Sequence, residues 1–200
     1  VKYIDDLGNK KIDNQPISLS IGLMLPHQPF IASKEDYEKY EKKVGMPKIP
    51  PTLLDECHPY IKWWRQRTGI EEVTEEEIGR CRIAYYALVD RMDKIIGRIL
   101  DSLERNGLME NTMIVYTSDH GEQLGEHGLW WKQTFYENSV KVPAIISWPG
   151  HLPEGQVLNS VVNQYDLIAT MLDASNSPKL PRSNGKSLLE HLKDPKNSEW

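Results

Sequence analysis

The first hydrophobic pattern along the chain is a simple alternation. Residues 16–25, PISLSIGLML, alternate large apolar side chains mostly with serine and glycine. A repeat of two places every second side chain on one face, which is typical of a β-strand. The opposite face is small and only weakly polar, so that a helix could pack closely against it. We predict a strand over 16–25 that ends at Pro26 and is followed by a loop starting at His27.

A second pattern, with apolar residues at roughly helical spacing, runs through residues 75–105. This spacing predicts a long amphipathic helix. Thr74 before the helix and Glu77 at its third position have the form of a capping box. Asn106 and Gly107 supply a stop signal at the other end.

Shorter apolar segments complete the pattern. Residues 112–118 predict a strand too apolar for an exposed sheet, and 143–148 predict another strand. Residues 164–174 and 186–192 predict helices. Strands and helices that follow one another in this way indicate an α/β fold. In such sheets, ligands lie beyond the carboxyl ends of the strands.

Polar side chains follow two of the predicted strands. His27 comes after the first strand, and Asp119 and His120 come after 112–118. A carboxylate and an imidazole together suit a divalent cation, and Gly121 lets the backbone turn tightly beside them. The alternative is that Asp119 caps a following helix and His120 only fills space.

Two further candidates lie in the same stretch, TSDHGEQLGEHGLWWKQT, residues 117–134. Lys132 follows two tryptophans, and a lysine beside aromatic bulk can be held as a fixed cation for an oxyanion. Its alternative is an ordinary solvated surface charge. His127 has three interpretations: a second metal ligand, a substrate contact or a loop residue that bonds to backbone. The last is favoured from the residues alone.

Composition narrows the classes of protein. The chain has 39% hydrophobic and 26% charged residues, which is typical of a globular domain. The net charge of -5, with both signs scattered, gives no basic surface for nucleic acid. No apolar run is long enough to cross a bilayer, so no membrane span is expected. Cys57 and Cys81 are the only cysteines and form neither a disulfide framework nor a CxxC knuckle.

Four segments occur in the order LPHQPF, SDHGE, GLWWK and YENSVKVP, a combination far more specific than any one of them. Together they resemble the sulfatases of the alkaline-phosphatase-like superfamily, and most of all its choline-sulfatase and phosphonate-monoesterase group. The resemblance covers roughly residues 15–195. It implies an αβα sandwich with a mixed, mostly parallel sheet, present here as a partial domain.

The resemblance also implies roles for the candidate residues. Asp119 and His120 would bind a divalent metal, usually calcium in sulfatases. Lys132 would contact the sulfate and its bridging oxygen. His27 would contact the same oxygens and could help to protonate the departing alkoxide, and His127 is a further substrate-binding candidate. The implied activity is hydrolysis of a small-molecule or saccharide sulfate ester.

One part of the family pattern is missing. The nucleophile of sulfatases is a formylglycine made within C/S-x-P-x-R, and this chain has no such motif. Cys57 begins the motif correctly, but Tyr60 and Ile61 stand where a small residue and arginine are required, and Cys57 follows the HQPF block. We therefore expect residues 1–200 to be the C-terminal part of one sulfatase-like catalytic domain, inactive alone, with the formylglycine and further acidic metal ligands upstream.

Two rival functions stay open from the sequence. A phosphonate or phosphate ester hydrolase of the same superfamily would use the same side chains on a phosphoryl centre. A non-catalytic module would keep the fold without the chemistry. The sequence does not decide the oligomeric state or the cellular location.

Overall fold

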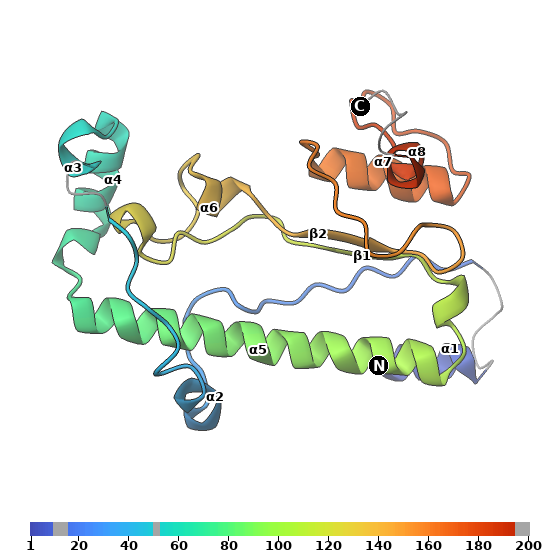
Figure 1. The fold of residues 1–200 in the computed structure, drawn as a ribbon, viewed down its shortest axis with the longest axis horizontal. Helices are drawn as coiled ribbons and strands as arrows, with labels where there is room; N and C mark the ends of the chain where they lie inside the picture. Colours follow the sequence, from blue (N-terminus) through green and yellow to red (C-terminus); the bar gives the residue numbers. More distant parts are fainter. Residues whose placement is uncertain (10–15, 50–52, 195–200) are drawn as a thin grey trace. The chain divides into compact units, whose positions relative to one another are not determined.

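The computed structural model describes residues 1–9, 16–49 and 53–194 (Figure 1). The chain forms two compact units. The first contains Val1–Gly107 and Ser118–Pro143, and the second contains Leu108–Thr117 and Ala144–Trp200.

Helix α5, Glu75–Arg105, dominates the first unit and confirms the predicted long helix. Its start is fixed by the predicted capping box: the Glu77 N–H donates to the Thr74 hydroxyl at 3.3 Å, and the Thr74 N–H donates to the Glu77 carboxylate at 2.9 Å. These reciprocal bonds satisfy donors that the first helical turn leaves without partners. The helix ends at Arg105 with Asn106 as its C-cap residue, and Gly107 has a φ of 65°.

The remaining helices of the first unit are short. They are α1 (Lys2–Gly8), α2 (Lys34–Glu38), α3 (Leu53–Glu56), α4 (Pro59–Thr68), η1 (Ile70–Glu72), η3 (Glu126–Gly128) and α6 (Glu137–Val140). Polar contacts attach two of them to α5. Asp5 of α1 accepts hydrogen bonds from Ser102 and Asn106, and Asp36 of α2 pairs with Lys94 at 3.2 Å.

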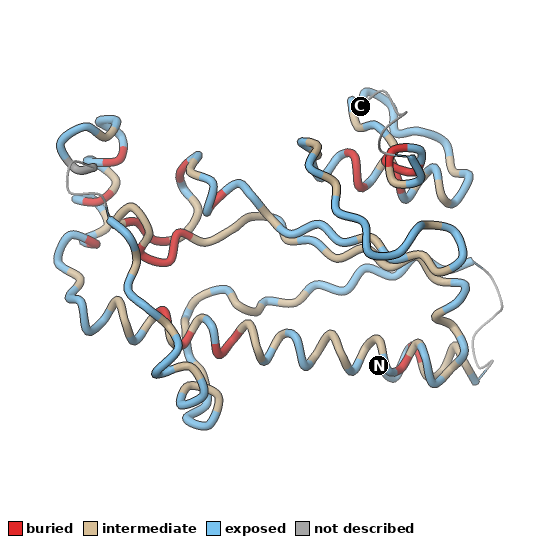
Figure 2. The backbone as a smooth tube through the Cα atoms, viewed as in Figure 1, coloured by how far each residue is buried: buried red, intermediate tan, exposed pale blue. Residues whose placement is uncertain are grey.

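The apolar core of the first unit lies where α4 and η1 meet the loop between residues 121 and 131 (Figure 2). Its buried members are Ile61, Ile70, Leu124, Leu129 and Trp130. Leu124, Leu129 and Trp130 of this loop are therefore buried, and the candidate site residues Asp119, His120 and Lys132 flank the loop in sequence.

The second unit contains the sheet. Strand β1 (Ile114–Thr117) pairs antiparallel with β2 (Ala144–Ser147), with Ile114 opposite Ser147. Both strands lie within the predicted ranges 112–118 and 143–148. The resemblance implied a mostly parallel sheet, whereas the ladder within the described residues is antiparallel. Helices η2 (Met109–Asn111), α7 (Gln164–Ala174) and α8 (Leu189–Lys193) complete the unit.

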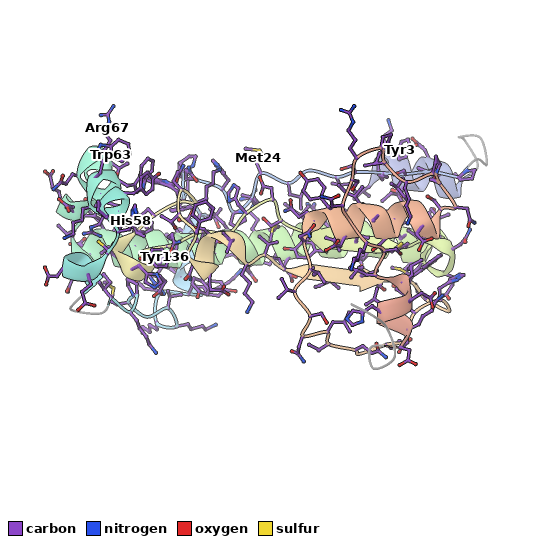
Figure 3. The ribbon with its side chains drawn as sticks, turned by 90° about the horizontal axis from the view of Figure 1, so that it is seen from above. Tyr3, Met24, His58, Trp63, Arg67 and Tyr136 are labelled. Carbon is purple, nitrogen blue, oxygen red and sulfur yellow. The ribbon has the colours of Figure 1, made fainter. Side chains whose placement is uncertain are left out.

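The predicted strand over 16–25 is wrong for this structure. The segment runs as irregular backbone (Figure 1), and Ile17, Leu19 and Ile21 are 44–48% exposed. Met24 projects outward in Figure 3. The alternation describes a strand only where a neighbouring strand accepts its backbone hydrogen bonds, and no such ladder to 16–25 occurs among the described residues.

Across the described ranges, none of the helices combines the length and the apolar character needed to traverse a lipid bilayer.

Candidate active site

The loop that follows β1 turns back on itself through an unusual number of left-handed residues. Positive φ values occur at Leu124, Gly125, His127, Gly128 and Trp131. Short-range backbone bonds close the turn, including Gly125 N–H to Leu129 O at 2.8 Å. Non-glycine residues seldom adopt this conformation, and clusters of them are found at functional sites.

Gly121 marks a point of close backbone approach. Its N–H donates to the carbonyl of Ser139 at 2.8 Å. A side chain at this position would collide with the carbonyl oxygen of Asn138. Only glycine fits here, as the sequence analysis expected for a tight turn beside His120.

Two buried arginines donate hydrogen bonds to backbone carbonyls of the loop. Arg82 of α5 donates to the carbonyls of Leu124 at 2.6 Å and Gly45 at 2.8 Å, and it pairs with Glu126 at 3.0 Å. Arg65 of α4 donates to the carbonyl of Gly128. Both arginines are 8% exposed, so these bonds are largely shielded from water.

The structure brings Asp119, His120 and Lys132 together. His120 Nδ1 lies 2.8 Å from the carbonyl of Gly121, and His120 Nε2 lies 2.7 Å from Lys132 Nζ. A carbonyl can only accept, so Nδ1 carries the proton and Nε2 presents its lone pair to the ammonium. Asp119 Oδ2 lies 3.6 Å from the same Nε2, and its Oδ1 accepts the His120 N–H at 3.0 Å.

His27 joins this group from a distant part of the sequence. Its ring lies edge-on to the His120 ring, with 6.4 Å between the centroids. The side chain is exposed, and its Nδ1 lies 2.8 Å from the carbonyl of Gln28. The expectation that the ends of 16–25 and 112–118 come together is thus met in space, although 16–25 forms no strand.

His127 has a different environment. Its ring stacks on Tyr136 with 4.2 Å between centroids and 8° between planes, and Tyr136 is labelled in Figure 3. Within the described residues, its buried Nδ1 has no hydrogen-bond partner. The ring contact of His127 is therefore with Tyr136, whereas that of His27 is with His120.

The Asp119–His120 pair fits a divalent cation as two ligands. Asp119 Oδ2 and His120 Nε2, 3.6 Å apart, can both lie about 2.0–2.5 Å from one ion, which would take the Nε2 lone pair in place of the Lys132 ammonium. The Asp119 side chain is 85% exposed and the His120 side chain 28%, so an ion can reach them. In the part of the chain that the structure describes, no cluster of three or more His, Cys, Asp or Glu completes a shell.

Several contributors to this geometry were not identified from the sequence. Glu122, Gln123, Arg65 and Arg82 act through hydrogen bonds, most of them to residues separated from them by nine or more positions. The two tryptophans of α4 lie in different environments, because Trp64 packs on the core while Trp63 is 52% exposed and projects from the helix in Figure 3.

The group contains the features of a metal-assisted hydrolytic site for a tetrahedral anion. These are the exposed carboxylate of Asp119, the imidazole of His120 with its directed lone pair, and the ammonium of Lys132. The model of the Sulfatase family matches residues 1–177. The chain belongs to the sulfatase family.

Individual relatives agree with this assignment. The chain is 36% identical over 195 residues to arylsulfatase K of Gallus gallus, covering 89% of this chain and 36% of the relative. It is 32% identical over 187 residues to choline-sulfatase of Rhizobium meliloti (strain 1021), covering 90% and 36%. The chain thus spans about a third of the length of these curated relatives.

Solved structures support the fold class. The phosphonate monoester hydrolase of Silicibacter pomeroyi superposes with a TM-score of 0.78 and 29% identity, covering 88% of this chain and 37% of that one. The α/β class and the alkaline-phosphatase-like architecture are therefore confirmed, with this chain forming part of such a domain.

Proposed function

We propose that the protein containing this chain hydrolyses sulfuric esters with the help of a divalent metal, and that calcium is this metal. The observation that carries the proposal is the 2.7 Å approach of Lys132 Nζ to His120 Nε2, with Asp119 and His27 around them. The arylsulfatase and choline-sulfatase relatives support a sulfate ester as the substrate class.

Each side chain has a role that follows from its charge. Hydrolysis of a sulfate ester gathers negative charge on the sulfuryl oxygens and on the leaving oxygen. Lys132 would stabilise this charge through its ammonium, and His27 would donate a proton or a hydrogen bond to the leaving oxygen. A cation held by Asp119 and His120 would supply further positive charge to the same oxygens.

None of the residues in this sequence is assigned as the nucleophile, because C/S-x-P-x-R is absent from it. We infer that a formylglycine supplied by the complete protein has this role. Residues 1–200 alone are expected to bind metal weakly and to turn over no ester. Hydrolysis of 4-nitrophenyl sulfate by residues 1–200 alone would contradict this.

The activity is tested in the complete protein with 4-nitrophenyl sulfate. Lys132→Ala should lower kcat/KM by about 10²–10³, the loss typical of one donor to a developing anion. Lys141→Ala is the matched control, because Lys141 is an exposed lysine paired only loosely with Glu137 at 3.9 Å. Equal rates for the two variants would remove Lys132 from the proposed site.

The metal proposal has its own test, which does not depend on turnover. Calorimetric titration of the metal-free complete protein with calcium should show one site. His120→Ala should weaken it by at least about tenfold. His151→Ala is the control, because His151 stacks on Trp148 in the other unit. Binding that is unchanged in His120→Ala would refute the assignment.

A second candidate activity is hydrolysis of phosphonate esters. It is favoured by the likeness to the phosphonate monoester hydrolase of Silicibacter pomeroyi. The same His27, Asp119, His120 and Lys132 would then act at a phosphoryl centre. Parallel kcat/KM measurements with sulfate and phosphonate esters of one leaving group would separate the two activities.

A further inference from the structure

Glu122 occupies a central position in the loop that joins His120 to Lys132. Its Oε1 accepts two backbone hydrogen bonds, from the Leu124 N–H at 3.1 Å and from the Trp131 N–H at 2.6 Å. A carboxylate that accepts backbone N–H groups forms charge-assisted bonds, which are shorter and stronger than neutral ones. Glu122 therefore joins the two ends of the turn.

The residue that Glu122 holds is the immediate neighbour of Lys132. Trp131 has a φ of 66°, an unfavourable backbone conformation for a bulky side chain. Its N–H is bonded to Glu122, and its carbonyl accepts the Gln123 N–H at 2.9 Å. Its ring packs edge-on against Trp64, with 6.2 Å between centroids. The peptide that leads into Lys132 is thus fixed on both sides.

The same turn is anchored at its beginning. Gly121 N–H bonds to the carbonyl of Ser139, and the fully buried Gln123 side chain donates to Thr134 and Ser139, each at 2.7 Å. The end of the loop next to His120 is therefore held independently of Glu122. Loss of the Glu122 carboxylate would remove the bond to the Trp131 N–H and loosen the Lys132 end, which would keep only the bond from the Gln123 N–H to the Trp131 carbonyl and the bond from the Gln123 side chain to Thr134. The bond from Gly121 to Ser139 at the His120 end would be unchanged.

We propose that Glu122 is a positioning residue, which sets the Lys132 ammonium against His120 Nε2 through the backbone of Trp131. This inference rests on the proposed function of Lys132. Glu122 touches neither the substrate nor the ammonium in this role. It acts by stabilising the left-handed Trp131 peptide from which Lys132 extends.

The test is a double-mutant cycle in the complete protein, with kcat/KM for 4-nitrophenyl sulfate as the readout. Glu122→Ala should lower kcat/KM by about tenfold to a hundredfold, because misplacement of a catalytic group by about 1 Å costs that much. Glu122→Gln keeps the accepting oxygen and should stay within about fivefold of the wild type. In a Lys132→Ala background, Glu122→Ala should lower kcat/KM by less than about threefold, since the ammonium that Glu122 positions is already absent.

Equal fold-losses for Glu122→Ala in the two backgrounds would overturn the proposal, because Glu122 would then act independently of Lys132. A merely structural role predicts this equality. Thermal melting of each variant identifies unfolding. If Glu122→Ala fails to fold, Glu122→Asp replaces it under the same criteria, since it keeps the charge but withdraws the carboxylate by one methylene.

A second measurement does not require turnover. Amide hydrogen exchange at Trp131 should be at least about tenfold faster in Glu122→Ala and close to the wild type in Glu122→Gln, because the bond to the carboxylate protects this amide. Unchanged exchange in Glu122→Ala would overturn the proposal. A different result would refute the proposed function of Lys132: faster exchange at the Trp131 amide in Glu122→Ala, combined with no hydrolysis of sulfate esters by the wild type. The two measurements therefore distinguish failure of the positioning role from failure of the proposed function.

Discussion

At the residue scale, Gly121 shows how one missing side chain shapes the candidate site. A β-carbon at this position would collide with the Asn138 carbonyl oxygen, and the Gly121 N–H is bonded to Ser139 O. The close approach keeps the backbone directly after Asp119 and His120 against α6. A larger residue must push these segments apart and so disturb the site as well as the fold.

Gly121→Ala should therefore lower the free energy of unfolding by about 1–3 kcal/mol, the usual range for overpacking. Gly97→Ala is the matched control. Gly97 lies within α5 with nothing near the position of the added methyl group, so this change should stabilise by about 0.5–1 kcal/mol. Urea unfolding of the three proteins measures both effects. If Gly121→Ala has a free energy of unfolding equal to or above that of Gly97→Ala, the close approach of Gly121 to the Asn138 carbonyl would be contradicted.

At the element scale, α5 has a well-defined N-terminus, and its residue Arg82 is bonded to the loop that follows His120. The pKa of Glu77 lies below its ordinary value of 4.5, because the Thr74 N–H and then the Thr74 hydroxyl donate to its carboxylate. A carboxyl whose pKa is lower in the folded state stabilises the fold above the ordinary pKa. This stabilisation is lost as the pH falls through the folded value.

The free energy of unfolding should consequently fall more steeply below pH 4.5 in the wild type than in Glu77→Gln. Thr74→Ala should cost about 1 kcal/mol at neutral pH, as expected for an N-cap. Urea unfolding between pH 3 and 7 measures both quantities. Identical pH profiles for the wild type and Glu77→Gln would show that the capping box does not control this dependence.

Arg82 connects α5 to the loop, and its removal has a different consequence. Arg82→Met would remove the donor to the Leu124 and Gly45 carbonyls and to Glu126 Oε1, while Glu126 Oε2 would keep its bond from the Lys48 N–H. Breaking a buried pair in this way typically costs about 3–5 kcal/mol, and the 26% exposure of the Glu126 side chain favours the lower end.

Arg80→Met provides the control for this change, because Arg80 lies on the exposed surface of the same helix. It should alter the free energy of unfolding by less than about 0.5 kcal/mol. The measurement is again urea unfolding at neutral pH. Similar losses in the two variants would mean that the bonds made by Arg82 contribute little.

At the scale of the whole molecule, the predictions that succeeded depend on local interactions. The box formed by Thr74 and Glu77 defines the start of α5 within one turn, and α7 occupies the predicted 164–174. The roles of Glu122 and Arg82 could not be predicted, because their partners are distant in sequence or lie across a turn of unusual conformation. The grouping of His27 with His120 was expected from the resemblance and from the order of the strands.

The segment 16–25 shows the limit of periodicity as a guide. Its alternation is genuine, yet whether it forms a strand depends on a partner that supplies backbone hydrogen bonds. In the described residues it has no ladder, and Ile17, Leu19 and Ile21 are nearly half exposed. A segment with strand periodicity, apolar side chains and no charge is a template for pairing with another chain.

Purified residues 1–200 should therefore self-associate through this segment as the concentration rises. Ile21→Lys should shift the protein toward the monomer, because a charge on the exposed apolar face opposes edge-to-edge pairing. Ile31→Lys adds the same charge at a residue that is 74% exposed but lies outside the segment, so it separates this effect from a general gain in solubility. Sedimentation velocity over a range of concentrations measures the association. If both variants shift it equally, net charge and not the pairing of 16–25 controls the assembly.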